Sequence, residues 1–105
     1  MAKYLVLYRA KTTAAEQMAA GTPEQAQAGM DAWMAWAQRA GDAVVDLGAP
    51  LTVVEPAGNA ADPIGGYSVL QADDAAALEK VLDGHPHTAT GGTIQILEFL
   101  PMPGM

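Results

Sequence analysis

The clearest signal in the chain is a helix whose start and end are both marked in the sequence. Thr22 can cap the helix, Pro23 suits its first position, and Gln25 can complete a capping box with Thr22. Gly41 is the residue expected just past the helix end. These signals predict a helix over residues 23–40. Its apolar stripe, which should pack on a sheet, consists of Ala26, Met30, Trp33, Met34, Ala37 and Ala40, with Trp36 at its border.

Four segments are rich in the apolar, aromatic and β-branched residues that favour strands. They are residues 3–9, 43–55, 65–72 and 93–100. The second segment contains Gly48 and Pro50, which a sheet tolerates best at a bulge or at an edge. We therefore expect the second segment to be a long, interrupted edge strand.

A second, shorter helix is predicted over residues 74–83. Asp73 can cap it, and Gly84 with Pro86 behind it can end it. The order of elements is then strand, helix, strand, strand, helix, strand, which is the split arrangement of ferredoxin-like folds. We expect an α+β protein with a βαββαβ chain and a four-stranded antiparallel sheet. Residues 10–21 are expected to be a connection that can hold one helical turn.

Length and composition indicate one domain, residues 1–105, because the chain has 105 residues and half of them are hydrophobic. The absence of cysteine excludes a disulfide framework and a thiolate nucleophile, and it fits a reducing compartment. The opening apolar run is too short for a signal peptide or a membrane span. A cytoplasmic protein without a membrane partner is therefore expected.

The charge balance argues against nucleic acid as a partner. Five basic residues stand against twelve acidic ones, which gives a formal net charge of -7 at pH 7. Such a chain repels phosphate backbones and anionic membrane surfaces, and no basic cluster offsets the average.

Several short segments together resemble the YCII-related family and its DGPF relatives, over nearly the whole chain. The segments are the opening strand, Gly41, Gly48-Ala49-Pro50-Leu51, Ile64-Gly65-Gly66-Tyr67, Gly84-His85-Pro86-His87 and Gly92-Thr93-Ile94. The resemblance implies the dimeric alpha-beta barrel fold, in which two ferredoxin-like sheets close face to face. It implies little settled chemistry.

One branch of that family is a dehydrochlorinase acting on a chlorinated ring-derived acid, with a histidine on the first helix paired to an aspartate. This chain departs from the branch, because counting back from Gly41 places Met30 where the helix histidine would stand. The Asp-Gly-Pro-Phe signature of the DGPF relatives is also missing, since only Asp62-Pro63 precedes the Gly65-Gly66 pair.

The expected topology brings several chemically useful residues to one end of the sheet. The end of the first strand, the start of the first helix and the loops before the third and fourth strands should all meet there. A mixed polar and apolar concavity of this kind suits a small-molecule ligand. The residues expected at its mouth are Tyr8, Arg9, Met30, Asp62, His85 and His87.

His87 is the first catalytic candidate, because an imidazole titrates near working pH and this residue lies beyond Pro86, where the chain turns toward the pocket. The alternative is a solvated loop histidine bonded to nearby backbone. His85 is the second candidate, although its place beside a helix-ending glycine suits a structural role at the negative end of the helix dipole. Asp46 is either a second carboxylate for chemistry or a solvent-facing strand residue.

Four further residues are substrate-binding candidates. The planar fork of Arg9 suits a substrate carboxylate, although such an arginine more often pairs with a surface acid. Tyr8, Met30 and Trp33 could line the cavity, or Met30 and Trp33 could be ordinary core residues. No cofactor and no metal is expected, because His85, His87 and a nearby aspartate lack regular ligand spacing. The glycines at 91 and 92 do not form a phosphate loop.

Two function classes fit these residues. The first is a cofactor-free lyase or isomerase that moves a proton on a small organic acid, with a histidine as general acid or base. The second is a non-catalytic dimer that binds a metabolite or a protein partner. A cofactor-free oxygenase is a third option. A homodimer is expected in each case, because apolar residues occupy both faces of the strands whereas two helices cover only one face.

Overall fold

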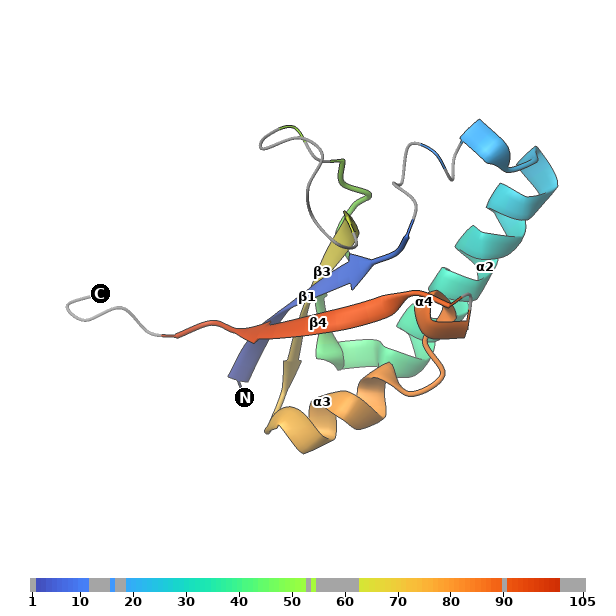
Figure 1. Cartoon of the computed structure of the whole chain (residues 1–105). Coiled ribbons are helices and arrows are strands. Elements are labelled where there is room, and N and C mark those ends of the chain that lie inside the picture. Colours follow the sequence, from blue (N-terminus) through green and yellow to red (C-terminus); the bar gives the residue numbers. More distant parts are fainter. Residues whose placement is uncertain are drawn as a thin grey trace.

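The computed structural model describes residues 2–11, 16, 19–52, 54, 63–89 and 91–100. Four strands form one antiparallel sheet in the order β2-β3-β1-β4 (Figure 1). The strands are β1 (Ala2–Arg9), β2 (Val44–Asp46), β3 (Ile64–Ala72) and β4 (Thr93–Glu98). The helices are α2 (Pro23–Ala40), α3 (Ala75–Leu82) and the short α4 (Pro86–Ala89), with a 3-10 turn at Gly41–Ala43. This is the predicted ferredoxin-like α+β fold.

The signals read from the sequence set both ends of α2 as predicted. The Thr22 hydroxyl accepts a hydrogen bond from the Gln25 backbone N–H at 3.1 Å, and the Gln25 side chain accepts from the Thr22 N–H at 2.9 Å. At the other end, Gly41 adopts a φ of 55°, a conformation that favours glycine. Its N–H donates to the Ala37 carbonyl and closes the helix.

Three details of the sequence prediction are corrected by the structure. Asp74, not Asp73, caps α3, because its carboxylate accepts from the Ala77 N–H at 2.8 Å. The segment after Gly84 is not all loop, because Pro86 opens α4, and the His85 carbonyl accepts from the Ala89 N–H at 3.3 Å.

The third correction concerns the second strand, which stops at Asp46 instead of running on to residue 55. The Asp46 carboxylate accepts a hydrogen bond from the Gly48 N–H at 2.9 Å, and the chain turns at this point. Gly48 has a φ of 89°, and a Cβ there would overlap the Tyr67 carbonyl. Pairing to β3 resumes in a bridge between Pro50 and Gly66, so the segment is an interrupted edge, as predicted, although Val53 and residues 55–62 lie outside the described residues.

The two faces of the sheet differ. Side chains alternate along a strand, so one face of β1 carries Tyr4, Val6 and Tyr8, all of which are buried. They pack with Leu70 and Ala72 of β3 and with Trp36, Leu78 and Leu82 of the helices; we call this side the covered face. The opposite face carries Leu5, Leu7, Tyr67, Val69 and Leu97, over which no described helix lies; we call it the open face.

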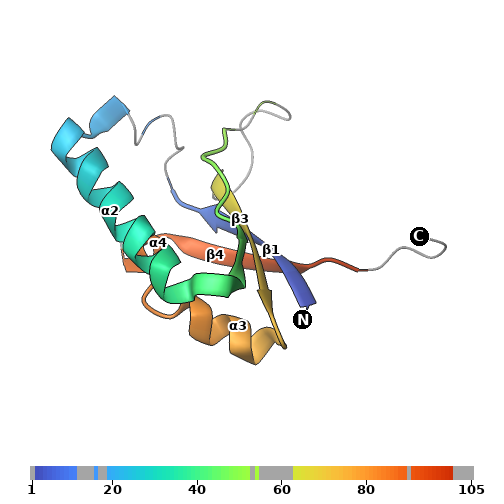
Figure 2. The ribbon, with the colours of Figure 1, turned by 180° about the vertical axis from the view of Figure 1, so that it is seen from behind.

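The apolar stripe predicted for α2 is only half right. Trp36 is its most buried residue, with Trp33, Ala37 and Ala40 half-buried around it. Met30 is 58% exposed and Met34 44% exposed, because the first half of α2 projects past the sheet (Figures 1 and 2). Helical periodicity gives the direction of a stripe but not the point at which the sheet beneath it ends.

None of the helices among the described residues has the length and apolarity to cross a lipid bilayer.

Candidate functional site

Both histidines lie at the start of α4, where it meets β1 and α2. The His85 ring has no exposed surface and is enclosed by three aromatic side chains. It stacks on Tyr8, with ring centroids 5.0 Å apart, and it meets Trp33 and Trp36 edge to face at 4.5 and 4.4 Å. The imidazole ring of His85 is therefore part of the core on the covered face.

The hydrogen bonds of His85 define its tautomer. The backbone N–H of His87 donates to His85 Nδ1 at 3.0 Å, so the proton of the neutral ring is on Nε2. Nε2 is buried and has no hydrogen-bond partner. The His85 ring as a whole meets two indole rings, and an N–H that faces an aromatic ring gains less than a regular hydrogen bond. His85 therefore presents a buried donor with unused capacity.

Burial, and to a lesser extent the nearby charge of His87, lowers the pKa of His85 from 6.5 to about 4. The ring is therefore neutral at pH 7. It is poorly suited to take up a proton and well suited to donate a hydrogen bond.

His87 is held in a fixed tautomer of its own. Its Nε2 lies 2.7 Å from the Arg9 carbonyl and 3.1 Å from the Thr93 carbonyl. Carbonyl oxygens only accept, so Nε2 must carry a proton, and in the neutral ring Nδ1 carries the lone pair. The half-buried ring also meets Tyr8 edge to face at 5.3 Å. The basic atom of His87 is therefore Nδ1.

Tyr8 connects the two histidines and ties the cluster to the sheet. Its hydroxyl donates to Ser68 Oγ at 2.9 Å, and Ser68 Oγ donates to the Leu47 carbonyl at 2.6 Å. Burial raises the pKa of the Tyr8 hydroxyl, which the Ser68 contact partly offsets. The ring of Trp33 completes the cluster at 4.8 Å from Tyr8.

The structure thus brings four of the predicted site residues together: Tyr8, Trp33, His85 and His87. It does not bring in the side chains of Arg9 and Asp46. Arg9 Nε donates to Gln95 Oε1 at 3.0 Å, on the open face. Asp46 accepts from the Gly48 N–H and, at 3.4 Å, from the Tyr67 hydroxyl, also on the open face. Met30 is on the exposed half of α2, and Asp62 lies outside the described residues.

Two members of the cluster were not predicted as site residues. Trp36 was placed only at the border of the helix stripe, yet it is 1% exposed and its indole N–H donates to the Val81 carbonyl at 2.9 Å. Ser68 lies in a strand at a position that alternation assigns to the covered face, which is the one signal that could have found it.

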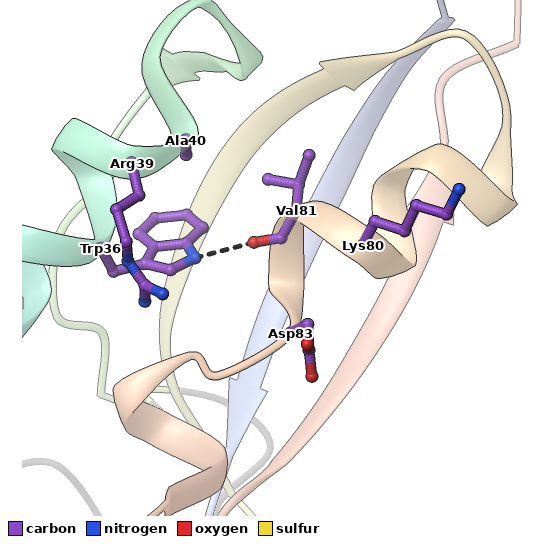
Figure 3. Close-up of a pocket in the computed structure, with 6 residues that line it drawn as sticks. All are labelled: Trp36, Arg39, Ala40, Lys80, Val81 and Asp83. Atoms are coloured by element: carbon purple, nitrogen blue, oxygen red, sulfur yellow. Dashed lines mark hydrogen bonds between the residues drawn. The ribbon is translucent and has the colours of Figure 1, made fainter.

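A groove of about 280 Å³ lies beside Trp36, between the ends of α2 and α3 (Figure 3). Arg39 and Lys80 sit in the last turns of these helices, where positive charge complements the helix dipole. Lys80 points away from the indole (Figure 3). The groove is lined by Trp36, Arg39, Ala40, Lys80, Val81 and Asp83. Its basic residues are explained by the helix ends, so we assign it no ligand.

Within the described ranges, no three histidine or carboxylate side chains are grouped so that they could hold a metal ion.

Comparison with known proteins fits this architecture. A similar solved structure is 5-chloro-2-hydroxyhydroquinone dehydrochlorinase (TftG) from Burkholderia phenoliruptrix AC1100, in complex with 2,5-dihydroxybenzoquinone. The TM-score is 0.54 at 14% sequence identity, and 93% of each chain is covered. No curated protein matches the sequence. The similarity therefore shows the fold, which is the ferredoxin-like α+β fold described above.

The YCII-related domain matches residues 2–103 of the chain. This span includes every described strand and helix, as well as both histidines. The protein therefore belongs to the YCII-related domain family.

Proposed function

We propose that this protein is a cofactor-free lyase or isomerase that moves a proton on a small organic acid. The observation that carries the proposal is the pair of complementary histidine tautomers around Tyr8. His87 has a lone pair on Nδ1, and His85 has an unpartnered, buried proton on Nε2. One ring can accept a proton while the other donates a hydrogen bond.

In the proposed reaction, His87 Nδ1 removes a proton from the carbon next to a carbonyl or carboxylate group. Negative charge then develops on the substrate oxygen. A neutral imidazole N–H in a dry site stabilises such an oxyanion, and this is the role proposed for His85 Nε2. The arrangement differs from the one expected from sequence, in which His85 was mainly structural. The proposal gives no role to the Arg9 guanidinium, which is bonded to Gln95.

The lyase class has independent support. A protein of similar fold is named as a dehydrochlorinase, and elimination of this kind begins with, or accompanies, loss of a proton. The proposal concerns the reaction class only and transfers no substrate from that protein.

Hydrogen exchange tests the proposal without requiring a known product. The protein is incubated in D2O with a panel of small organic acids that carry a proton next to a carbonyl group, and loss of the proton signal is followed by NMR. For an acid that exchanges or reacts, His87→Asn should lower the rate by about two to four orders of magnitude, with Tm nearly unchanged. Full activity in this variant would refute the role of His87.

A second candidate function is a non-catalytic metabolite-binding protein. The observation that favours it is the complete burial of His85, because no ligand reaches Nε2 unless an aromatic neighbour moves. In that case, acids from the panel would shift the amide signals of Tyr8 and His87 but would show no exchange above that of buffer.

We also propose that the protein acts as a homodimer. The open face presents half-buried Leu5, Leu7, Tyr67 and Val69, and Leu97 is 42% exposed. Monomeric proteins seldom leave a large contiguous apolar patch on a sheet face uncovered. A second copy, placed face to face by a two-fold axis, would cover it.

A further inference from the structure

Two adjacent glycines precede β4, and the structure requires them for different reasons. Gly91 has a φ of 89°, which favours glycine, but a Cβ there would have no neighbour within 4 Å. Gly92 has no positive φ, so its backbone suits any residue. A Cβ at Gly92, however, would overlap Nε2, Cε1 and Cδ2 of the His87 ring. The requirement at Gly92 is therefore purely steric.

We infer that Gly92 is a positioning residue for His87. The ring lies against the Gly92 Cα while its Nε2 reaches the carbonyls of Arg9 and Thr93. We call the Gly92 Cα and these two carbonyls the imidazole cradle. Arg9 is the last residue of β1, Thr93 is the first residue of β4, and Gly92 directly precedes Thr93. Arg9 and Thr93 are paired with each other in the sheet. The cradle thus fixes the ring relative to the sheet.

A side chain at Gly92 cannot be accommodated by moving the backbone alone. The Gly92 N–H donates to the His87 carbonyl at 3.1 Å, so the two residues are already joined at the main chain. The group that an added methyl would overlap is the ring, so we expect the ring to be displaced by rotation of the His87 side chain. Displacement takes Nε2 away from one or both carbonyls.

The cradle also selects the tautomer. Both carbonyls accept hydrogen bonds, so the ring is bound only with a proton on Nε2, which leaves the lone pair on Nδ1. Without the cradle, the tautomers mix and Nδ1 loses its direction. This conclusion about position and tautomer stands by itself, and its consequence for catalysis rests on the proposed function.

The test compares Gly92→Ala with the neighbouring variant Gly91→Asn. Asparagine tolerates a positive φ better than most residues, and a Cβ at position 91 has no neighbour within 4 Å. Long-range ¹H–¹⁵N NMR spectra report which ring nitrogen carries the proton. We expect the wild type and Gly91→Asn to show His87 protonated on Nε2, and Gly92→Ala to show mixed tautomers. An unchanged tautomer in Gly92→Ala overturns the inference.

A double-mutant comparison keeps the inference testable if Gly92→Ala folds poorly. In a His87→Ala background the ring is absent, so adding Gly92→Ala should lower Tm much less than it does in the wild type. An equal loss of Tm in both backgrounds overturns the inference.

Exchange rates separate this inference from the proposed function. If the tautomer changes and the rate falls about tenfold or more with a smaller change in KM, both stand. If the tautomer changes and the rate does not, the cradle stands and the catalytic role of His87 fails.

Discussion

The two faces of the sheet differ in how far the rest of the chain covers their side chains and satisfies their polar groups. On the covered face, buried polar atoms are largely satisfied within the chain: the Tyr8 hydroxyl, Ser68 and the Trp36 indole N–H all have partners. On the open face, the polar contacts of Arg9 and Asp46 are exposed, and Leu97 faces solvent. The covered face is therefore a packed core, whereas the open face has no described helix over it.

The single buried polar side-chain atom without a hydrogen bond on the described part of the covered face is His85 Nε2. An orphan atom in an otherwise satisfied core calls for an explanation, because it costs stability. A ligand acceptor provides one, and this is why the proposed site lies on the covered side, whereas the proposed dimer contact lies on the open side.

The largest effect should come from the covered face. Trp36→Ala removes a large buried ring and its bond to the Val81 carbonyl, so we expect the free energy of unfolding to fall by about 3–5 kcal/mol. Met30→Ala on the exposed half of the same helix should change it by less than about 0.5 kcal/mol. Urea denaturation measures both. If Trp36→Ala cannot be purified, Trp36→Phe, which keeps a ring, should lose about 1–2 kcal/mol. Equal effects at the two positions would contradict the difference between the halves of α2.

The open face is tested by charge. Leu97→Asp places a carboxylate in the proposed dimer contact, and we expect the dimer dissociation constant to rise at least about 100-fold, as measured by sedimentation. The control is Ile96→Asp, because the neighbouring residue points to the covered side, opposite Val6. A wild type that sediments as a monomer at micromolar concentration, or a dimer weakened equally by both variants, would count against the open face as the contact.

The pH dependence of stability tests the burial of His85. The unfolded chain binds a proton at this residue below pH 6.5, whereas the folded chain does not bind one until the pH approaches the folded pKa of about 4. The free energy of unfolding should therefore fall as pH drops from 6.5 toward 4, by at most about 1.4 kcal/mol per pH unit.

The interval from pH 6.5 to 5.0 is the informative one, because carboxylates titrate mainly below it. His85→Asn should flatten the slope there, because it removes the buried imidazole. A wild-type slope equal to that of His85→Asn would show that the ring is not held neutral by the fold.

The sequence was informative where structure is local. Thr22, Gln25 and Gly41 act through bonds within one helix turn, so the ends of α2 could be predicted to the residue. The strand at residues 3–9 was also predicted, and β1 covers Ala2–Arg9. The cap of α3 is Asp74, one residue after the predicted Asp73, because adjacent aspartates can both accept the capping hydrogen bond.

Features that depend on distant parts of the chain could not be predicted in the same way. The second strand ended early because Gly48 must fit against the Tyr67 carbonyl, and the exposure of Met30 depends on where the sheet ends. The two histidines were correctly placed near Tyr8, but the burial of His85 depends on Trp33 and Trp36, more than forty residues away in the sequence.

The smallest effect concerns two neighbouring residues of β3 that face opposite sides. Ser68→Ala removes the group that joins the Tyr8 hydroxyl to the Leu47 carbonyl, both on the covered face, and should lower the free energy of unfolding by about 1–2 kcal/mol. Tyr67→Phe removes only an exposed contact of 3.4 Å to Asp46, which is at the limit of hydrogen bonding, and should cost a few tenths of a kcal/mol. Both are measured by urea denaturation at a concentration that keeps the oligomeric state constant, because a dimer contact would add to the Tyr67 value. The Tyr67→Phe loss could instead equal the Ser68→Ala loss and disappear on dilution. That result would show that the Tyr67 hydroxyl lies in the contact between two copies and not in solvent.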